Sequence, residues 1–351
     1  MSATPTTRPT TSTTAAHAQS LAQGAAGAAL LPIERAHRGE GTWDDAHRAL
    51  AGCTRQLVAD QTASLYFGAP AVAFALHAAN AANAANSRYR RALTVLDQRI
   101  DELTARRLTL AHARIDRRER ARAAEFDLFY GLTGIGAHLL ARHPGSPRLR
   151  EILSYLVRLT ASLPGDPDAL PGWWCGVGPS GEDSPAFPGG HANLGMAHGI
   201  AGPLSLLSLA ISANIVVDGH TAAIRHICDW LDHHRQPGPA GAWWPQWITL
   251  DEHRAGRVTQ PGPLRPSWCY GTPGLARAQQ LAAIALGDRA RKHMAQNALA
   301  DCLADPAQRG RIHDAGLCHG LAGLLHTAHR VAADADPDDA GRITSRNCAR
   351  C

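Results

Sequence analysis

Arg265-Pro-Ser-Trp-Cys269-Tyr270-Gly271-Thr-Pro-Gly274 leads directly into the apolar stretch Leu275-Ala-Arg-Ala-Gln-Gln-Leu281. Two glycines separated by two residues predict a sharp turn, followed by a helix that packs too closely on its neighbour to allow a side chain. The pattern returns later in the chain as Cys318-His319-Gly320-Leu-Ala-Gly323-Leu-Leu. This recurrence predicts a repeat architecture in which a glycine loop opens each apolar helix.

Six copies of the pattern occur along the chain, and alanine replaces the second glycine only in the second copy. Successive first glycines lie 44 to 72 residues apart, which leaves room for two helices and a connection. The copies are Gly24-Ala-Ala-Gly27, Gly68-Ala-Pro-Ala71, Gly131-Leu-Thr-Gly134, Gly199-Ile-Ala-Gly202, Gly271-Thr-Pro-Gly274 and Gly320-Leu-Ala-Gly323.

The segments between these loops are of two kinds. Residues 200–213 are apolar nearly all round, as expected of a buried inner helix, whereas residues 148–163 and 222–234 are amphipathic and suit an outer layer. Inner helices ringed by outer helices predict an all-α fold, an α/α toroid of helical hairpins. No run of alternating apolar and polar residues predicts a β-strand convincingly.

Other segments suggest a long helix and packed loops. Residues 88–124 are highly charged, but residues from Leu93 to Leu103 place leucine and isoleucine at the spacing of one helix face. The arginines of this segment indicate a solvated face, with peptide binding as the alternative. The loops 164–190 and 237–266 are rich in Pro, Gly and Trp, and we expect them to pack and to shape the rim of a cleft.

The composition excludes several classes of protein. Of the 351 residues, 45% are hydrophobic and 19% are charged, which is typical of a globular chain with a sizeable core. The net charge is only +5, and no dense basic stripe with interleaved aromatics points to nucleic acid. No apolar run has the roughly 18–20 residues of a membrane helix. We expect a domain over residues 18–333, between disordered tails at 1–17 and 334–351.

The eight cysteines are scattered through a chain without an export signal, which favours a reducing cytoplasm over a disulfide framework. Only Cys269 and Cys318 share a local context, two residues before the first glycine of a repeat. Together with His319 they form the ligand set of a catalytic zinc that keeps one coordination position open. Cys348 and Cys351 form a lone C-x-x-C pair, which we expect to be disordered.

Four motifs resemble the lanthionine synthetase C-like family of lanthipeptide cyclases. They are Trp268-Cys269-Tyr270-Gly271, Cys318-His319-Gly320, Asn193-Leu-Gly-Met-Ala-His198-Gly199 and Asp127-Leu-Phe-Tyr-Gly131. The fold of that family is an α/α toroid of seven repeats around a zinc ion. With six copies of the repeat in this sequence, the last repeat is expected to be missing.

The resemblance also implies roles for individual residues. Cys269, Cys318 and His319 would hold the zinc ion. His198 would carry protons and Asp127 would orient it. Two polar residues would face the metal: Arg265, which would stabilise enolate charge, and Tyr270, which would position a carbonyl group.

The implied activity is a zinc-dependent peptide cyclase. It would form lanthionine and methyllanthionine rings by adding cysteine thiolates to dehydroalanine or dehydrobutyrine. The implied substrate is a dehydrated, leader-bearing precursor peptide. The implied partners, in the cytoplasm, are a separate dehydratase and a membrane-associated transporter complex.

Three alternatives stay open. The chain could be a non-cyclising adaptor of the same family that binds a thiol such as glutathione, or an inactive remnant that lacks the last repeat. A glycosidase on a toroid would need two carboxylates flanking a cleft. Glu125 and Asp127 lie near a helix start, but no convincing second carboxylate lies on a matching loop.

Overall fold

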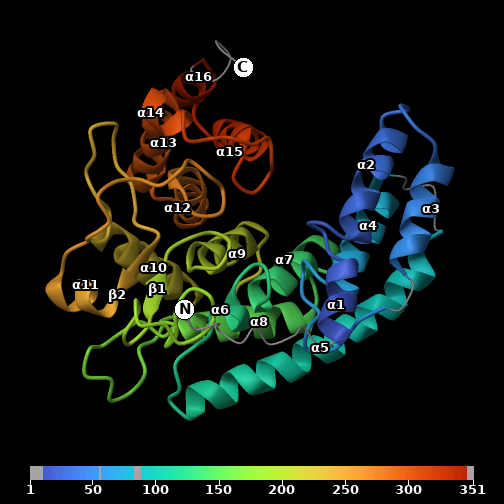
Figure 1. Ribbon diagram of the computed structural model, residues 1–351, viewed down its shortest axis with the longest axis horizontal. Coiled ribbons are helices and arrows are strands. Elements are labelled where there is room, and N and C mark those ends of the chain that lie inside the picture. Colours follow the sequence, from blue (N-terminus) through green and yellow to red (C-terminus); the bar gives the residue numbers. More distant parts are fainter. Residues whose placement is uncertain (1–10, 55–56, 83–87, 346–351) are drawn as a thin grey trace, which may run out of the picture. The chain divides into compact units, whose positions relative to one another are not determined.

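The computed structural model describes residues 11–54, 57–82 and 88–345 of the chain (Figure 1). The described residues are mostly α-helical, as predicted. None of the helices in these ranges has the length and apolar character that a bilayer-spanning helix needs. The Cys348–Cys351 pair lies outside the described residues.

The chain divides into two compact units, and the first comprises residues 1–110 and 129–148. In this unit α2 packs on α3 and α4, and α4 packs on α7. Its elements are α1 (Thr11–Ala18), α2 (Ala25–His37), α3 (Trp43–Cys53), α4 (Ala69–Ala82), most of α5 (Arg90–Asp116) and α7 (Leu132–Arg142).

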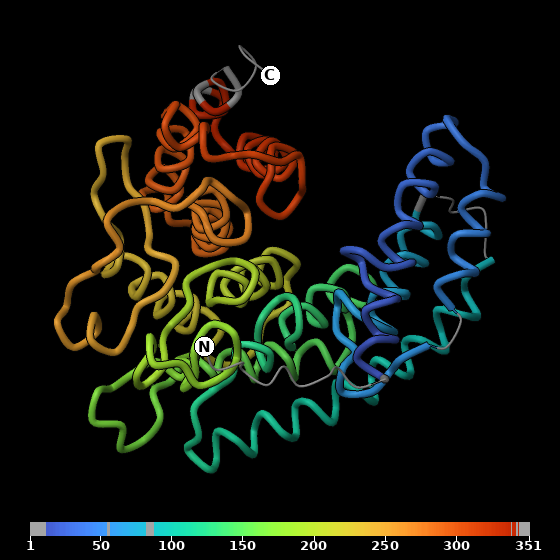
Figure 2. Tube along the Cα trace, in the orientation of Figure 1, coloured from blue at the N-terminus to red at the C-terminus, as the bar shows by residue number. Residues whose placement is uncertain are grey.

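The second unit comprises residues 111–128 and 149–351. Here α9 packs on α10 and α12, and α12 also packs on α13 and α15 (Figure 2). The elements are α6 (Ala123–Phe126), most of α8 (Pro147–Leu159), β1 (His191–Asn193), α9 (Ala201–Ser212), α10 (His220–His233), β2 (Trp247–Thr249), α11 (Leu250–Ala255), α12 (Thr272–Leu286), α13 (Arg289–Ala304), α14 (Pro306–Arg309), α15 (Leu321–Ala333) and α16 (Pro337–Ser345).

The glycine loops open the inner helices as predicted. The first glycine of each copy is the N-cap of its helix or precedes the helix by one or two residues: Gly24 before α2, Gly68 before α4, Gly131 before α7, Gly199 before α9, Gly271 before α12 and Gly320 before α15.

The loops before α12 and α15 share one hydrogen-bond arrangement that accounts for their two glycines. Before α12, the carbonyl of Ser267 accepts from the amides of Gly271 (3.2 Å) and Gly274 (3.3 Å). Before α15, the carbonyl of Gly316 accepts from Gly320 (3.0 Å) and Gly323 (3.2 Å). A Cβ atom on the second glycine would collide with the backbone of the loop in both copies. The tight turn therefore fixes how each loop enters its helix.

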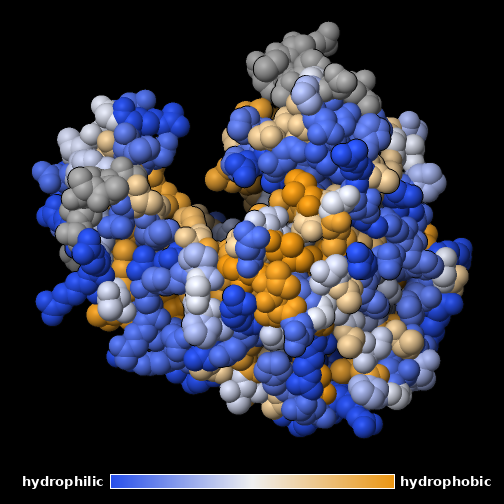
Figure 3. Space-filling view, turned by 180° about the vertical axis from the view of Figure 1, so that it is seen from behind, coloured by the Kyte–Doolittle hydropathy of each residue, from blue (hydrophilic) through white to orange (hydrophobic). Residues whose placement is uncertain are grey.

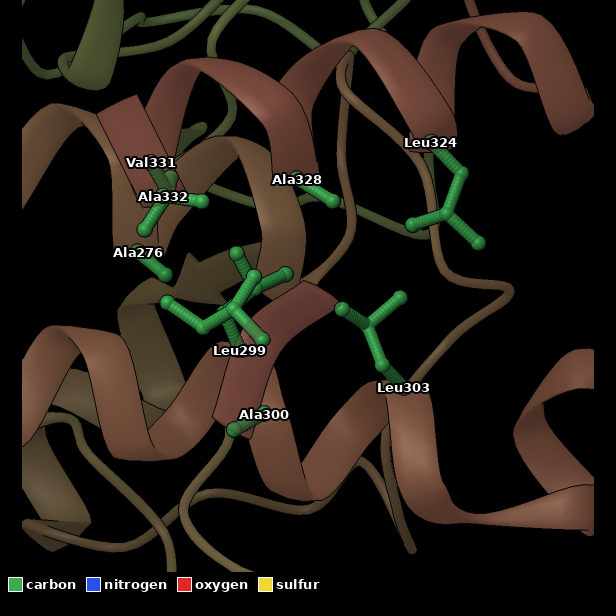
Figure 4. Packing of buried hydrophobic residues seen from close by; sticks show 9 residues of the cluster. Ala276, Leu299, Ala300, Leu303, Leu324, Ala328, Val331 and Ala332 are labelled. Carbon is green, nitrogen blue, oxygen red and sulfur yellow. The ribbon is translucent and has the colours of Figure 1, made fainter. Parts of the chain in front are cut away.

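A cluster of buried apolar side chains joins α12, α13, α15 and α16 (Figure 4). Because α12 and α15 are both part of this core, the loops at their N-termini are held in a defined relation. The buried members are Ala276, Leu299, Ala300, Leu303, Leu324, Ala328, Val331, Ala332 and Ile343.

Apolar side chains also reach the surface (Figure 3). On and just before α15, Leu317, Leu321 and Leu325 are spaced by four residues and are each more than half exposed. In the preceding repeat, Thr272 and Ala276 of α12 take the positions of Leu321 and Leu325, and both are buried. Part of that burial comes from α15, because Ala276 packs in the cluster that holds α15 to α12.

The long helix α5 agrees with its predicted pattern. Leu93, Leu96, Ile100 and Leu103 are all at most 3% exposed, so they form one buried face. The amphipathic segments 148–163 and 222–234 likewise contain most of α8 and α10.

The expectation of disordered tails is wrong for part of each tail. Residues 11–18 form α1, where Ala16 is buried in a cluster with Val58 and Phe67, and the His17 ring lies 4.6 Å from the Phe67 ring. At the other end, α16 is held by Ile343, which is 1% exposed in the core cluster. Polar contacts add to these apolar ones, since the Ser12 hydroxyl of α1 donates to Asp60 and Lys292 pairs with Asp336 just before α16 (3.1 Å). Composition alone did not indicate these contacts.

The structure contains two short strands that the sequence pattern did not indicate. β1 and β2 pair antiparallel, with His191 opposite Thr249 and Asn193 opposite Trp247. Each strand has only three residues, which is too short for an alternating pattern to be recognised. The strands tie together the two tryptophan-rich loops, in which Trp173, Trp174 and Trp244 are buried as predicted.

Candidate functional site

Two cysteines and one histidine converge in the second unit. Cys269, Cys318 and His319 each offer one ligand atom, and these atoms all lie within 4.8 Å of one another. Cys269 is buried and the other two residues are partly exposed. Each cysteine lies two residues before the glycine that caps its helix, α12 or α15. The convergence predicted from the repeat is therefore present.

Main-chain hydrogen bonds connect the four loops that carry the predicted site residues. The amide of Cys269 donates to the carbonyl of Cys318 (3.3 Å), and the carbonyl of Cys269 accepts from Met196 (2.9 Å) and Ala197 (3.3 Å). The carbonyl of Ala197 in turn accepts from Leu128 (3.1 Å). These bonds place the loops of Asp127, His198, Cys269 and Cys318 against one another.

His198 pairs with the buried carboxylate of Asp127. Nδ1 of His198 lies 2.6 Å from Oδ2 of Asp127, whose carboxylate is fully buried, while the imidazole is partly exposed. A carboxylate only accepts hydrogen bonds, so we assign the ring proton to Nδ1 and the basic lone pair to Nε2. This arrangement suits a histidine that moves protons at Nε2.

Tyr270 packs against the loop that carries His198. The ring centroids of Tyr270 and His198 are 6.1 Å apart. Gly195 makes this approach possible, because a Cβ atom there would lie 2.5 Å from Cδ1 of Tyr270 and 2.7 Å from the carbonyl oxygen of Cys269. Burial raises the pKa of the Tyr270 hydroxyl, so at neutral pH it is an uncharged hydrogen-bond donor.

Arg265 meets the cluster through Asp314. Nη1 of Arg265 and Nε2 of His319 each lie 3.7 Å from Oδ2 of Asp314, which is an ion-pair distance. Asp314 was not among the residues predicted from the sequence. It precedes Cys318 by four residues in a polar loop, and nothing in that local pattern distinguishes it from other loop aspartates.

The two thiols influence each other strongly. The hydrogen bond between them lowers the pKa of Cys269 and raises the pKa of Cys318, because ionising one sulfur makes it costly to ionise its neighbour. A divalent cation between the sulfurs would remove that cost. The Ser267 hydroxyl lies 3.6 Å from Sγ of Cys269 and further lowers its pKa.

The donor set fits a zinc ion. Zinc binds thiolate sulfur at about 2.3 Å in tetrahedral geometry, so its donors lie roughly 3.7 Å from one another. The three donors lie within 4.8 Å of one another and would need only a small contraction. Two thiolates and one imidazole would neutralise the ion and leave a fourth position open.

Glu125 does not take part in this group. Its Oε1 accepts from Nη2 of Arg114 (2.7 Å) and from the hydroxyl of Tyr155 (2.6 Å), and its Oε2 accepts from Nε of Arg114 (2.9 Å). This engagement leaves Glu125 a structural role beside Asp127, which is paired with His198. The geometry gives no support to a glycosidase that uses these two carboxylates.

Two features define the class of this protein. Its helical hairpins begin at glycine loops, and two cysteines and a histidine cluster just before the N-termini of α12 and α15. The chain is a member of the lanthionine synthetase C-like protein family, whose profile matches residues 16–339. This match confirms the family resemblance that the sequence motifs indicated.

Individual relatives agree with this assignment. The chain is 22% identical over 268 residues to the nisin biosynthesis protein NisC of Lactococcus lactis subsp. lactis, and the match covers 75% of this chain and 61% of that relative. The chain thus spans less than two thirds of the relative's length. A solved structure of a nisin cyclase is similar with a TM-score of 0.74 and 20% identity, covering 89% of this chain and 76% of the other.

The structural likeness confirms the predicted fold class, an α/α toroid. The number of repeats that this chain contributes stays a prediction.

Proposed function

We propose that the chain is a zinc-dependent peptide cyclase that forms thioether rings in a dehydrated precursor peptide. The observation that carries this proposal is the convergence of Cys269, Cys318 and His319 within 4.8 Å, on loops hydrogen-bonded to those of His198 and Asp127. The chain belongs to the lanthionine synthetase C-like family, and its fold is similar to that of a nisin cyclase. Both findings support a lanthipeptide precursor as the substrate.

The reaction joins a cysteine sulfur to the β-carbon of dehydroalanine or dehydrobutyrine in the same peptide. The π electrons of the double bond move toward the α-carbon and its carbonyl, and the resulting enolate takes up one proton. The sum is the addition of S–H across C=C, so no oxidant or reductant is needed and the peptide keeps its mass. A zinc ion bound by Cys269, Cys318 and His319 would supply the lowered thiol pKa that makes the sulfur nucleophilic at neutral pH.

His198 moves the proton in this scheme. Its Nε2 is the basic ring atom, because Nδ1 donates to Asp127. Nε2 accepts the proton released by the substrate thiol and can return it to the α-carbon, which balances the proton over one turnover. Asp127 holds the tautomer and stabilises the imidazolium that forms in between.

Tyr270 and Arg265 act on the developing negative charge. The neutral hydroxyl of Tyr270 donates to the carbonyl oxygen of the dehydrated residue. The guanidinium of Arg265, which is partly exposed beside Asp314, stabilises the enolate charge. Under this scheme a separate dehydratase makes the substrate, and the protein works in the cytoplasm with the export machinery as a further partner.

The test uses a dehydrated precursor peptide with free cysteines. The zinc-loaded protein is incubated with the peptide, and free thiols are counted by alkylation and mass spectrometry. We expect free thiols to disappear while the unalkylated mass stays constant, and we expect Cys318→Ala to abolish this loss. Constant thiol counts with the zinc-loaded protein would contradict a cyclase. Tight retention of glutathione under the same conditions would favour a thiol-binding adaptor.

A further inference from the structure

Asp314 lies between the imidazole of His319 and the guanidinium of Arg265. Its Oδ2 is 3.7 Å from Nε2 of His319 and 3.7 Å from Nη1 of Arg265. The carboxylate is 41% exposed, and His319 is 44% exposed. Both contacts thus lie at the partly exposed edge of the cluster.

The loop fixes the position of Asp314 rigidly. Its Oδ1 accepts from the amide of Gly316 (2.7 Å), and its carbonyl accepts from the amide of Leu321 (3.0 Å), the first residue of α15. A Cβ atom at Gly320 would collide with both Oδ1 and the carbonyl oxygen of Asp314. One carboxylate oxygen is therefore used by the turn, and the other lies 3.7 Å from both His319 Nε2 and Arg265 Nη1.

We infer, on the basis of the zinc site in the proposed function, that Asp314 is a positioning residue that orients His319 toward the two sulfurs and tethers Arg265 beside them. An imidazole that binds a metal through one nitrogen commonly presents its other N–H to a carboxylate, which fixes the ring and makes the ligating nitrogen more basic. Because Nε2 is the nitrogen beside Asp314, we assign the metal-binding role to Nδ1 of His319.

The Asp314 carboxylate connects the metal-binding residue His319 with Arg265, which acts on the enolate charge. Arg265 is held on the loop that also carries Cys269, whereas Asp314 is on the loop of Cys318. Their ion pair spans the two loops that supply the sulfurs. Loss of the charge at Asp314 would release both His319 and Arg265, so metal affinity and the placement of Arg265 would change together.

A purely structural role for Asp314 makes a different prediction. Asparagine caps an Asx turn about as well as aspartate does, so Asp314→Asn keeps the hydrogen bond to Gly316 and removes the charge. Asp305 provides a matched control, because its Oδ1 accepts from the amide of Ala307 (2.9 Å) in the same two-residue turn. Asp305 caps α14 and is not part of the cluster.

The experiment measures zinc affinity of the full chain by competition with a chromogenic chelator. The proteins are the wild type, Asp314→Asn, Asp305→Asn and Cys269→Ser, with thermal unfolding recorded for each. We expect Asp314→Asn to weaken zinc binding by about 10- to 100-fold at an unchanged Tm. Asp305→Asn should bind zinc like the wild type, and Cys269→Ser should lose most of the binding.

Cobalt substitution gives a second readout. Its visible absorption reports the geometry around the metal, and we expect the spectrum of Asp314→Asn to differ from that of the wild type. If Asp314→Asn lowers the Tm, Asp314→Ser, which keeps a weaker turn cap, is measured in its place.

If Asp314→Asn binds zinc with wild-type affinity and gives the wild-type cobalt spectrum, the role of Asp314 is overturned. The zinc site itself would then still stand. Absence of zinc binding by the wild type would overturn both.

Discussion

Nδ1 of His198 lies 2.6 Å from Oδ2 of Asp127, on a carboxylate that is fully buried. The two residues come from loops joined by the hydrogen bond from Leu128 to Ala197. A buried carboxylate paired in this way fixes both the tautomer and the orientation of the imidazole. A substitution at Asp127 that keeps its shape and removes its charge therefore tests the role of the pair.

Asp127→Asn should slow ring formation while metal binding persists. The amide cannot stabilise a positively charged imidazole, and its NH2 group can reverse the tautomer of His198. General acid–base catalysis contributes about 100- to 10,000-fold, and we expect a loss in that range in the rate of thiol consumption. Zinc content should equal that of the wild type. A variant that cyclises at the wild-type rate would exclude proton transfer by an Asp127-oriented His198.

Gly195→Ala should damage the site through packing. The new methyl group would lie 2.5 Å from the Tyr270 ring and 2.7 Å from the carbonyl oxygen of Cys269, so the loops of His198 and Cys269 must separate. We expect a loss of about 1–3 kcal/mol in the free energy of unfolding and a reduced rate of cyclisation.

Gly262→Ala is the control for this substitution, because a Cβ atom at Gly262 meets nothing within 4 Å. Denaturant titration of both variants makes the comparison. Equal stability of the two variants would show that the close approach at Gly195 is not required.

Arg114→Met should lower the free energy of unfolding more than Tyr155→Phe does. Both residues bind Glu125, which lies on α6, two residues before Asp127. Without Arg114, which is 8% exposed, the Glu125 carboxylate is left without its counter-charge, at a cost of about 3–5 kcal/mol. Tyr155→Phe removes one hydrogen bond, at a cost of about 1 kcal/mol. Equal losses in chemical denaturation would refute the ion pair as the anchor of α6.

His138 should make stability depend on pH. It is 2% exposed, and neither ring nitrogen has a hydrogen-bond partner among the described residues. Burial, with a smaller effect of the Arg142 charge, lowers its pKa from 6.5 to about 4. The unfolded chain therefore binds a proton between these values and the folded chain does not. The contribution of His138 to the free energy of unfolding is therefore complete above pH 6.5. It falls by up to about 3 kcal/mol as the pH drops toward 4.

The contribution of His138 is isolated by comparison with His138→Leu. We expect the variant to lose less stability than the wild type between pH 6.5 and 4, as measured by thermal unfolding at each pH. Parallel curves for the two proteins would mean that His138 is protonated in the folded state without cost.

The repeat pattern allowed much of the fold to be predicted. The amides of Gly271 and Gly274 donate to one carbonyl, and the loop leaves no space for a side chain at either position. The same arrangement explains the glycines at Gly320 and Gly323. Because this constraint is local, it can be read from a short stretch. It also placed Cys269 and Cys318 at equivalent positions of consecutive repeats, which predicted their convergence.

Other features depend on contacts between distant residues and left no local signal. The pairing of β1 with β2 involves three residues on each side and is set by the loops around them. Ile343 orders α16 through a cluster formed by three other helices. Asp314 acquires its contacts only after the loops of Arg265 and His319 have come together. A composition or spacing pattern cannot reveal such residues.

Zinc analysis of the purified protein tests the central claim most directly. Wild-type protein and Cys228→Ala, which alters a buried cysteine outside the cluster, should each carry about one zinc ion per chain. Cys269→Ala and Cys318→Ala should carry little or none. A full complement of zinc in both of these variants would contradict the assignment of the two sulfurs as ligands, and with it the proposed ring-closing chemistry.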